Sequence, residues 1–327
     1  LLKSISIIIP TWNGKELLEK FLPSVIKACK YYSGETEIIV VDDGSTDGST
    51  QFLKANYPLI KLVSLKVNQG FAKACNIGVG ESTGDIVILL NNDIEVREDF
   101  LLPLSKHFND EQIFGVRLGI RWLTEEGIAT DISHFFLGID FRFGLIECPM
   151  LRLKESIKPF YCAYISGGAG AFNRNKWLQL GGFDQMFRPF YWEDVDISYR
   201  AWKRGWKIIF EPESRVYHQP HSTIFRCYKQ NSIRRVSERN RYLLVWKNIN
   251  DHWFIIKHLF FIPCRLLINL CTGNLSYLLA FFDALKHLPE VYKRRKIERQ
   301  NRLVHDREIF LLFNRIARKT EPFYEKN

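Results

Sequence analysis

The chain of 327 residues and 38.5 kDa contains 46% hydrophobic and 25% charged residues, a composition typical of folded globular proteins. Disordered, collagen-like and coiled-coil proteins are therefore excluded, and the length allows one large domain or two ordinary ones. The net charge of +10 comes from residues 222–327, where 21 Lys and Arg face 9 Asp and Glu, so this region is expected to meet a membrane surface, a phosphorylated lipid or nucleic acid.

Short apolar runs alternate with amphipathic stretches through the first hundred residues. The runs SISIIIP, EIIVVDD, IKLVSL and GDIVILLNND are typical of strands, and the segments between them of helices. The opening run lacks a charged start and a cleavage site, so it is expected to be a strand and not a signal peptide. Near-continuous apolar strands need cover on both faces, which predicts an α/β fold with a mostly parallel, Rossmann-like central sheet and flanking helices.

Beyond His221 the strand–helix alternation stops and long helix-permissive stretches follow. Residues 253–271 are strongly apolar but include Lys257, Pro263 and Arg265, which argue against a membrane-spanning helix. We expect either helices lying in a membrane interface, with basic residues toward the headgroups, or a helical subdomain packed on the core. The predicted organisation is one domain over residues 1–221 and a basic helical region over residues 222–327.

Two carboxylates close the second predicted strand. Asp42 and Asp43 are followed by Gly44, which permits a tight turn, and by residues 45–49, which offer helix caps. An acidic pair at the carboxyl end of a strand can accept hydrogen bonds from a base or a ribose, and ligands of such sheets bind beyond this edge. Asp47 is interpreted as a turn and cap residue, whereas Asp43 is a candidate ligand-binding carboxylate.

A second polar group, Asn91, Asn92 and Asp93, ends the fourth apolar run. If the two strands are neighbours, this carboxylate lies beside the first pair and can hold a divalent cation. Magnesium and manganese favour oxygen ligands and are often held by one or two carboxylates together with substrate phosphates. Asn and Asp are also common turn residues, so the pattern alone fits a turn as well.

A third cluster stands at the start of a predicted helix, where Glu193, Asp194 and Asp196 follow the aromatic residues 190–192. The helix dipole favours an acidic first turn but does not account for the aromatic residues directly before it. A carboxylate in an aromatic-lined cleft can take a proton from a hydroxyl nucleophile.

Two further motifs exclude familiar sites. The glycine-rich run 166–171 allows close approach of a ligand, but it has neither the dinucleotide nor the P-loop fingerprint. His218 and His221 form an H-x-x-H whose Pro220 argues against a helical zinc face, while His218 follows a predicted strand and can turn into the cleft. Seven scattered cysteines without a C-x-x-C pair predict neither a disulfide framework nor a zinc knuckle, and fit a reducing compartment.

Taken in order, the motifs SIIIPTWNG, VVDDGSTDGS, NQGFAKACNIG, GDIVILLNND, SGGAGAFNR, LGGFD and YWEDVDISYR resemble family two glycosyltransferases, which are inverting enzymes of the GT-A fold with nucleotide-sugar donors. The resemblance covers about residues 4–218. Within the family the chain is similar to bacterial rhamnosyltransferase-type enzymes that extend cell-surface polysaccharides on lipid carriers. The resemblance implies a GT-A catalytic domain followed by a membrane-associating helical region.

The resemblance assigns a role to each matching residue. Asp194 would be the general base, and Asp93 would bind the Mg²⁺ or Mn²⁺ that bridges the donor diphosphate. His218 would complete the metal site, and Asn91, which stands where the family has the first Asp of its D-x-D, would offer a neutral oxygen. The donor-binding residues would be Pro10, Thr11, Trp12, Asp43, Asn76 and Asn92, and the acceptor-side residues Gly168, Trp192 and Glu193.

The function implied is inverting transfer from a UDP-, dTDP- or GDP-sugar to a lipid-linked saccharide, by an enzyme on the inner face of the cytoplasmic membrane. One alternative is a metal-dependent nucleotidyl- or phosphotransferase, for which no basic residue near the phosphates is evident. Another is a catalytically silent GT-A assembly domain, against which the retained Asp43, Asp93 and Asp194 argue. A nucleic-acid partner is not expected, because the basic residues are mixed with long apolar runs and no binding module is evident.

Overall fold

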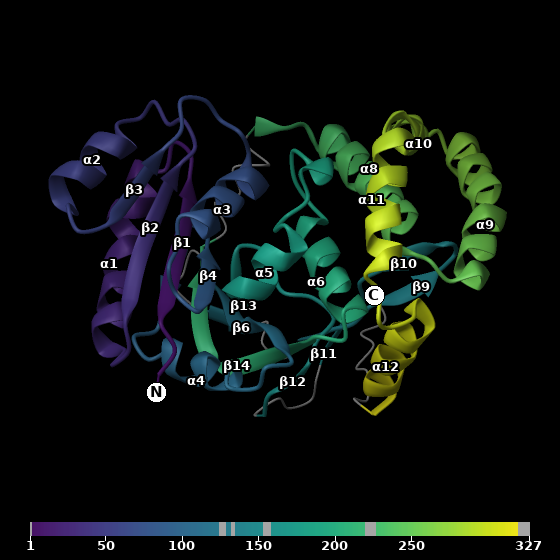
Figure 1. Cartoon of the computed structure of the whole chain (residues 1–327). Helices are drawn as coiled ribbons and strands as arrows, with labels where there is room; N and C mark the ends of the chain where they lie inside the picture. Colours follow the sequence, from purple (N-terminus) through teal and green to yellow (C-terminus); the bar gives the residue numbers. More distant parts are fainter. Residues whose placement is uncertain (1, 124–128, 132–134, 153–157, 220–226, 320–327) are drawn as a thin grey trace.

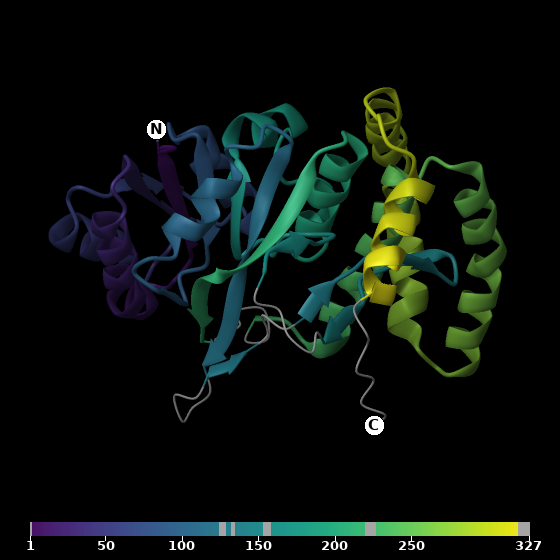
Figure 2. The ribbon, with the colours of Figure 1, turned by 90° about the horizontal axis from the view of Figure 1, so that it is seen from below.

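A computed structural model describes residues 2–123, 129–131, 135–152, 158–219 and 227–319. The sheet and its flanking helices occupy one end of the molecule, and the C-terminal helices form a bundle at the other end (Figure 1). The same separation is visible from below, where the bundle lies beside the sheet (Figure 2).

Ten strands form one sheet with the main path β12-β14-β6-β13-β4-β1-β2-β3, while β5 pairs with β14 and β7 with β6. The strands of this sheet are β1 (Ile5–Thr11), β2 (Thr36–Asp42), β3 (Lys61–Ser64), β4 (Ile86–Leu90), β5 (Ile94–Val96), β6 (Ile113–Leu123), β7 (Ala129–Asp131), β12 (Phe160–Tyr161), β13 (Ala169–Asn173) and β14 (Lys207–His218). Two small hairpins pair β9 (Asp140–Arg142) with β10 (Leu145–Glu147) and β8 (Phe135–Leu137) with β11 (Met150–Arg152).

The helices follow the predicted order. Those of the first two thirds are α1 (Lys15–Tyr31), α2 (Ser49–Asn56), α3 (Phe71–Gly80), α4 (Leu101–His107), α5 (Arg174–Leu180) and α6 (Glu193–Lys203), with a short 3₁₀ turn η1 (Gln185–Phe187). Those of the last third are α8 (Gln230–Asn248), α9 (His252–Cys271), α10 (Leu275–Lys286), α11 (Leu288–Gln300) and α12 (Asp306–Lys319).

The first four strands confirm the predicted α/β pattern, because β1 to β4 are mutually parallel and separated by helices. Alternate residues of β1 pack on opposite faces of the sheet. Ile7 and Ile9 join the cluster formed with α1 and α4, whereas Ile8 joins the cluster formed with α3 and α6. Both faces are therefore covered, as the continuous apolar runs require.

The second half of the sheet is mixed, because β13 runs antiparallel to both β4 and β6. Ala169 pairs with Leu90, so the start of β13 lies beside the end of β4. This reversal brings the glycine-rich run to the edge where the parallel strands end.

The C-terminal helices belong to the same hydrophobic cluster as one face of the sheet, through residues such as Tyr242, Leu243 and Phe310. In α9, His258 is the one buried residue, and partly buried residues such as Phe254 and Ile262 pack against the same cluster. This helix is continuous through Pro263, and it is long and apolar enough to cross a membrane. Pro263 and the charged residues therefore do not interrupt the helix. The division at residue 221 stays a prediction.

Buried ion pairs join α6 to the bundle. Lys247 Nζ on α8 lies 2.7 Å from Asp184 Oδ2 and 2.8 Å from both carboxylate oxygens of Asp196, and all three side chains are at most 5% exposed. Arg200 Nε donates to Asp196 at 2.8 Å and Arg294 lies 2.7 Å from Asp184. Burial alone raises the pKa of Asp184, but Lys247 and Arg294 outweigh it and lower that pKa to about 2.

Replacing Lys247 by Met leaves two buried carboxylates without this counter-charge. We expect Lys247→Met to lower the free energy of unfolding by about 1.5–3 kcal/mol, because both buried carboxylates lose a charged hydrogen-bond donor, although Arg200 and Arg294 stay paired with them. Urea unfolding of both proteins measures the difference. Lys286→Met is the matched control, since that side chain is 74% exposed beside Asp283 and should cost less than about 1 kcal/mol. Equal losses in the two variants would contradict the role of the buried network.

Candidate active site

The candidate residues collect where β1, β2 and β4 end and β13 begins. Pro10 and Thr11 are the last residues of β1, and Trp12 directly after them is 37% exposed. The backbone N–H of Asp43, just after β2, donates to the Thr11 carbonyl at 2.8 Å. Parallel strands bring their carboxyl ends to one edge, so the predicted nucleotide-side residues are neighbours.

Asp43 is 4% exposed, and both its oxygens accept backbone hydrogen bonds. Oδ1 accepts from Gln69 N at 2.7 Å and Oδ2 from Gly70 N at 2.8 Å, which fixes the loop that enters α3. Each carboxylate oxygen has a second acceptor site and can also accept a hydrogen bond from a nucleotide base. This contact with the base stays a prediction. Asp47 accepts from Lys15 N and from Ser49, which agrees with its predicted structural role.

The Asn76 side chain makes two hydrogen bonds to the backbone of Phe183. Its Nδ2 donates to the Phe183 carbonyl and its Oδ1 accepts from Phe183 N, both at 2.8 Å. The amide therefore holds the LGGFD segment against α3. Direct support of the donor by Asn76 stays a prediction.

The segment after β4 contacts strands on both sides. Asn92 Nδ2 donates to Thr11 Oγ1 at 2.8 Å, and Asn91 N donates to the Gly168 carbonyl at 2.8 Å. A Cβ on Gly168 would lie 2.5 Å from the Asn91 amide nitrogen, so only glycine allows this approach. The polar residues after β4 are thus fixed against β1 and the glycine-rich run.

The side chains of Asp93, the last residue of the polar segment after β4, and of His218, the last residue of β14, lie next to each other. Asp93 Oδ1 lies 3.1 Å from His218 Nε2, because His218 ends β14 and pairs with Ile94 of β5. Asp93 is 7% exposed, and its Oδ1 is buried without a hydrogen bond among the described residues.

A carboxylate oxygen lacking a hydrogen bond beside an imidazole nitrogen is a donor pair that fits a divalent cation such as Mn²⁺. Among the described residues, no group of three His, Cys, Asp or Glu side chains converges, so substrate phosphates would supply further ligands. Asn91 has its side chain against Gly168, as described above. His221 lies outside the described residues.

Asp194, in the first turn of α6, contacts the other side of the glycine-rich run. Gly167 N donates to its Oδ2 at 3.2 Å, and Val195 N donates to its Oδ1 at 2.8 Å. Gly168 is bonded to Asn91 and Gly167 to Asp194, so two adjacent glycines connect the segment after β4 to the start of α6. We call this series of contacts the glycine bridge.

The two carboxyl groups at the start of α6 have raised pKa values. Burial, and then the neighbouring Asp194 charge, raise the pKa of Glu193 to about 8. Burial also raises the pKa of Asp194, and this effect outweighs the opposite effect of its backbone hydrogen bonds. Glu193 is 8% exposed, and its Oε2 has no hydrogen-bond partner among the described residues. At neutral pH Glu193 therefore holds a proton beside the candidate base.

The loop before α6 is strained and held by α8. Tyr191 and Trp192 have φ angles of 71° and 77°, the left-handed region that costs free energy for non-glycine residues. Asn240 Nδ2 donates to the carbonyls of Phe187, Phe190 and Tyr191 at 2.7–2.9 Å. Because Asn240 is buried, this clamp keeps the aromatic residues in place.

Three α8 residues at this site were not predicted. Besides Asn240, Ser237 Oγ accepts from the Trp192 indole N–H at 3.0 Å, and the Arg241 guanidinium lies 5.8 Å from the Trp192 ring centre. Arg188, also unpredicted, has its Nε 4.0 Å from where a Cβ on Gly70 would lie, close to the Asp43 loop. A lone Asn, Ser or Arg in a polar helix carries no signal of its partner some fifty residues away.

Two family models match the chain. The model described as glycosyl transferase family 2 matches residues 6–150, and the one described as glycosyl transferase family group 2 matches residues 86–287.

Among curated proteins, an N-acetylglucosaminyl-diphospho-decaprenol L-rhamnosyltransferase of Mycobacterium tuberculosis is 26% identical over 67% of this chain and 77% of its own. N-acetylgalactosaminyltransferase 7 of Drosophila melanogaster is 26% identical over 68% of this chain. The chain spans only 40% of the length of that protein and 34% of a related one from Caenorhabditis elegans.

Three solved structures share the fold. GalNAc-T7 with UDP, GalNAc and Mn²⁺ has a TM-score of 0.57 at 21% identity, over 76% of this chain and 49% of its own. A Pyrobaculum calidifontis mannosyltransferase with GDP-Man and Mn²⁺ has a TM-score of 0.53 at 16% identity, and the match covers 97% of this chain and 87% of that one. Residues 1–349 of S. aureus TarS have a TM-score of 0.55 at 15% identity, and the match covers 99% of this chain and 93% of that one.

The raised pKa of Glu193 predicts a pH dependence of stability. A group whose folded-state pKa lies above its ordinary value of 4.5 stabilises the native state below that value, and the contribution is lost as pH rises toward about 8. Wild-type stability should therefore fall between about pH 4.5 and 8, and Glu193→Gln should flatten much of that fall. Urea unfolding at several pH values measures it. Parallel curves for the two proteins would contradict a buried, protonated Glu193.

Proposed function

Because this chain belongs to glycosyl transferase family 2 and has its GT-A α/β fold, we propose that it transfers a sugar, with inversion, from a nucleotide-sugar donor to a lipid-linked saccharide. The observation that carries the proposal is the glycine bridge, which joins Asn91, two residues before Asp93, to Asp194 across one sheet edge. One end suits a diphosphate with a divalent cation, and the other suits an acceptor hydroxyl.

The comparisons support this choice of substrates. The mycobacterial relative is named for rhamnosyl transfer to an N-acetylglucosaminyl-diphospho-decaprenol, which supports a lipid-linked acceptor and a role in cell-surface polysaccharide synthesis here. Two structural neighbours were solved with UDP or GDP-Man together with Mn²⁺, which supports a nucleotide-sugar donor and a divalent metal.

On the donor side, Asp93 and His218 would hold Mg²⁺ or Mn²⁺, with Asn91 beside them. Bound there, the metal supplies positive charge where the departing nucleoside diphosphate becomes negative. The nucleotide would lie over the ends of β1 and β2, against Trp12 and Asp43, with the remaining predicted donor residues around it.

Asp194 is the proposed general base. Its carboxylate takes the proton of the acceptor hydroxyl while the hydroxyl oxygen forms a bond to the anomeric carbon. The bond from that carbon to the diphosphate oxygen breaks, and its electron pair leaves with the nucleotide. Attack opposite the departing group inverts the anomeric centre, and this needs one carboxylate only, unlike the pair in inverting glycosidases.

The surroundings of Asp194 suit this task. Burial raises its pKa, which makes the carboxylate a stronger base, and the Gly167 N–H holds one oxygen in place. Protonated Glu193 keeps a second negative charge away from Asp194 at neutral pH. Trp192 and Gly168 would shape the acceptor side.

The bundle is the proposed membrane-facing region, on the cytoplasmic side of the membrane. Only 6% of the apolar stretch of α9 is buried, and large apolar side chains are exposed on α9, α10 and α11. Residues 222–327 also carry the positive charge of the chain. Exposed apolar groups beside basic ones favour an anionic bilayer surface.

We propose residues 1–221 as the catalytic domain and residues 222–327 as this bundle.

Removing the proposed base separates catalysis from binding. Asp194→Asn should leave Mn²⁺-dependent thermal stabilisation by UDP-, dTDP- or GDP-sugars nearly unchanged, because Asn keeps the size of Asp and its one carbonyl oxygen can accept one of the two backbone hydrogen bonds. Transfer should fall about 10²- to 10⁴-fold, the usual contribution of a general base. Undiminished transfer would contradict the assignment. Donor binding without transfer in the wild type would indicate a silent GT-A domain.

Vesicle binding tests the membrane-facing surface. Phe260 and Leu267 on α9 are 67% and 61% exposed. The double variant Phe260→Ser, Leu267→Ser should bind phosphatidylglycerol-containing vesicles at least tenfold more weakly, because each buried large apolar side chain contributes about 1.5–3 kcal/mol. Leu59→Ser is the matched control, since Leu59 is fully exposed at the other end of the chain. Sedimentation with vesicles measures the difference. Unchanged binding of the double variant would contradict the proposal that this face of α9 binds the membrane.

A further inference from the structure

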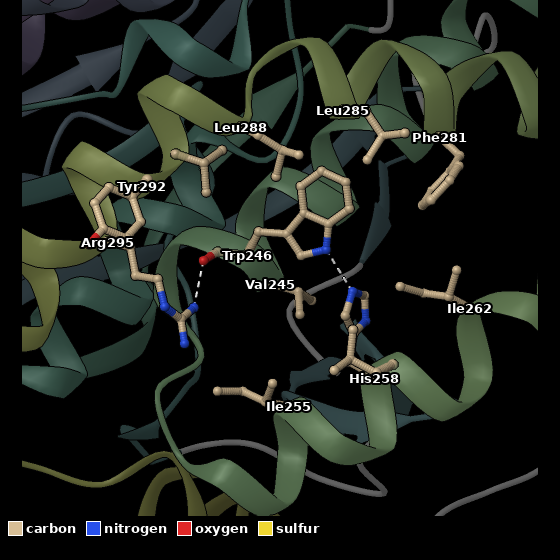
Figure 3. Close-up of a pocket in the computed structure, with 12 residues that line it drawn as sticks. Val245, Trp246, Ile255, His258, Ile262, Phe281, Leu285, Leu288, Tyr292 and Arg295 are labelled. Carbon is tan, nitrogen blue, oxygen red and sulfur yellow. Dashed lines mark hydrogen bonds between the residues drawn. The ribbon is translucent and has the colours of Figure 1, made fainter.

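An apolar cavity of about 530 Å³ lies among α8, α9, α10 and α11 (Figure 3). Of the described residues that line it, Arg295 alone carries a fixed charge. The lining residues are Val245, Trp246, Ile255, His258, Leu259, Ile262, Phe281, Leu285, Leu288, Val291, Tyr292 and Arg295. A volume of this size is typical of ligand sites, and its lining suits a hydrocarbon.

His258 ties α9 to α8 and to the turn between β9 and β10 at the wall of the cavity. Its Nε2 accepts from the Trp246 indole N–H at 2.6 Å (Figure 3), and its Nδ1 donates to the Gly144 carbonyl. Burial lowers the pKa of His258, which favours the neutral ring that this pair of bonds requires. Because both ring nitrogens are engaged, His258 is a fixed wall of the cavity.

The outer surface around the cavity is apolar and exposed. Leu259 and Tyr292 line the cavity and are themselves 61% and 72% exposed. The cavity is thus continuous with the exposed surface of α9 and α11, and a hydrocarbon chain can enter it without crossing a polar rim at these residues. The Arg295 guanidinium, which donates to the Trp246 carbonyl at 2.6 Å, places one positive charge in the wall.

The cavity is connected to the acceptor side through α8. Arg241 lies over the Trp192 ring, and Val245, four residues later, lines the cavity. Four helical residues advance about 6 Å along the axis, so the cavity begins roughly one turn from the Trp192 contact.

We propose that this cavity binds the hydrocarbon chain of the phosphate-linked acceptor, with Arg295 facing its phosphate. The inference rests on the proposed function, because it takes the acceptor to be lipid-linked. The chain fills the space between α9 and α8, and the saccharide end reaches Trp192 and Asp194. The position beside α8 favours the acceptor over a bulk membrane lipid, which would bind anywhere on the exposed face.

The test uses farnesyl phosphate, a soluble isoprenoid phosphate, and isothermal calorimetry on the full chain. Ile255→Trp fills the cavity, whereas Ile256→Trp places the same ring on the neighbouring outward position, where Ile256 is 59% exposed. We expect wild type and Ile256→Trp to bind equally and Ile255→Trp to bind at least tenfold more weakly. Equal affinities for all three proteins would overturn the assignment. Thermal midpoints of the variants confirm that both are folded.

Two further ligands separate the possible sources of the signal. Inorganic phosphate should not bind at the same concentrations, and 1-stearoyl-lysophosphatidic acid should bind more weakly than farnesyl phosphate. An acyl chain that binds as tightly would make the cavity a general lipid anchor and overturn the acceptor assignment.

Nucleotide-sugar binding with Mn²⁺ is measured on the same samples. Donor binding without farnesyl phosphate binding overturns this inference alone. The reverse result leaves a hydrocarbon site in the bundle but removes the proposed function, and with it the acceptor as occupant.

Discussion

Lys247 on α8 places its ammonium between the carboxylates of Asp184 and Asp196, and none of the three side chains has appreciable contact with water. Buried charges need partners, so the docking of α8 stabilises α6 and the segment before it in their observed positions, together with Arg200 and Arg294. Asn240, two turns earlier on the same helix, clamps the loop that ends at Trp192. The start of α6, with Glu193 and Asp194, therefore depends on contacts from outside the sheet.

The sheet supplies the other half of the site by a simpler route. Three parallel strands bring Thr11, Asp43 and the Asn91–Asp93 segment to one edge. A backbone hydrogen bond joins Asp43 to Thr11, and a side-chain hydrogen bond joins Asn92 to Thr11. Gly167 and Gly168, directly before the reversed strand β13, then contact both halves of the site. Rigid strands position the donor side, and a strained, clamped loop positions the acceptor side, as is common where a site needs an uncommon backbone conformation.

Sequence reasoning recovered what depends on local pattern. Continuous apolar runs predicted the first four strands. Polar residues directly after these runs predicted that Asp43 and Asp93 lie at the carboxyl edge of the sheet. It did not predict the strand β13, because Ala169–Asn173 is short and overlaps a glycine-rich run. It also missed Asn240, Arg241 and Lys247, since helical periodicity says which face is buried but not which distant carboxylate or carbonyl it meets. Pro263 misled the reading of α9, because a proline inside a helix is tolerated where its surroundings allow it.

The buried pairing of α8 with α6 has a consequence for how such a chain can change over evolutionary time. Exchange of the helical half for that of another enzyme would remove Lys247 and Arg294, which leaves Asp184 without either partner and Asp196 with Arg200 alone, unless the new half carried basic residues at the same places. The two halves are therefore expected to be inherited together and to diverge in concert. New acceptor preferences would then arise by single substitutions along the free face of α8 and the walls around it, and modular recombination would be a rare route.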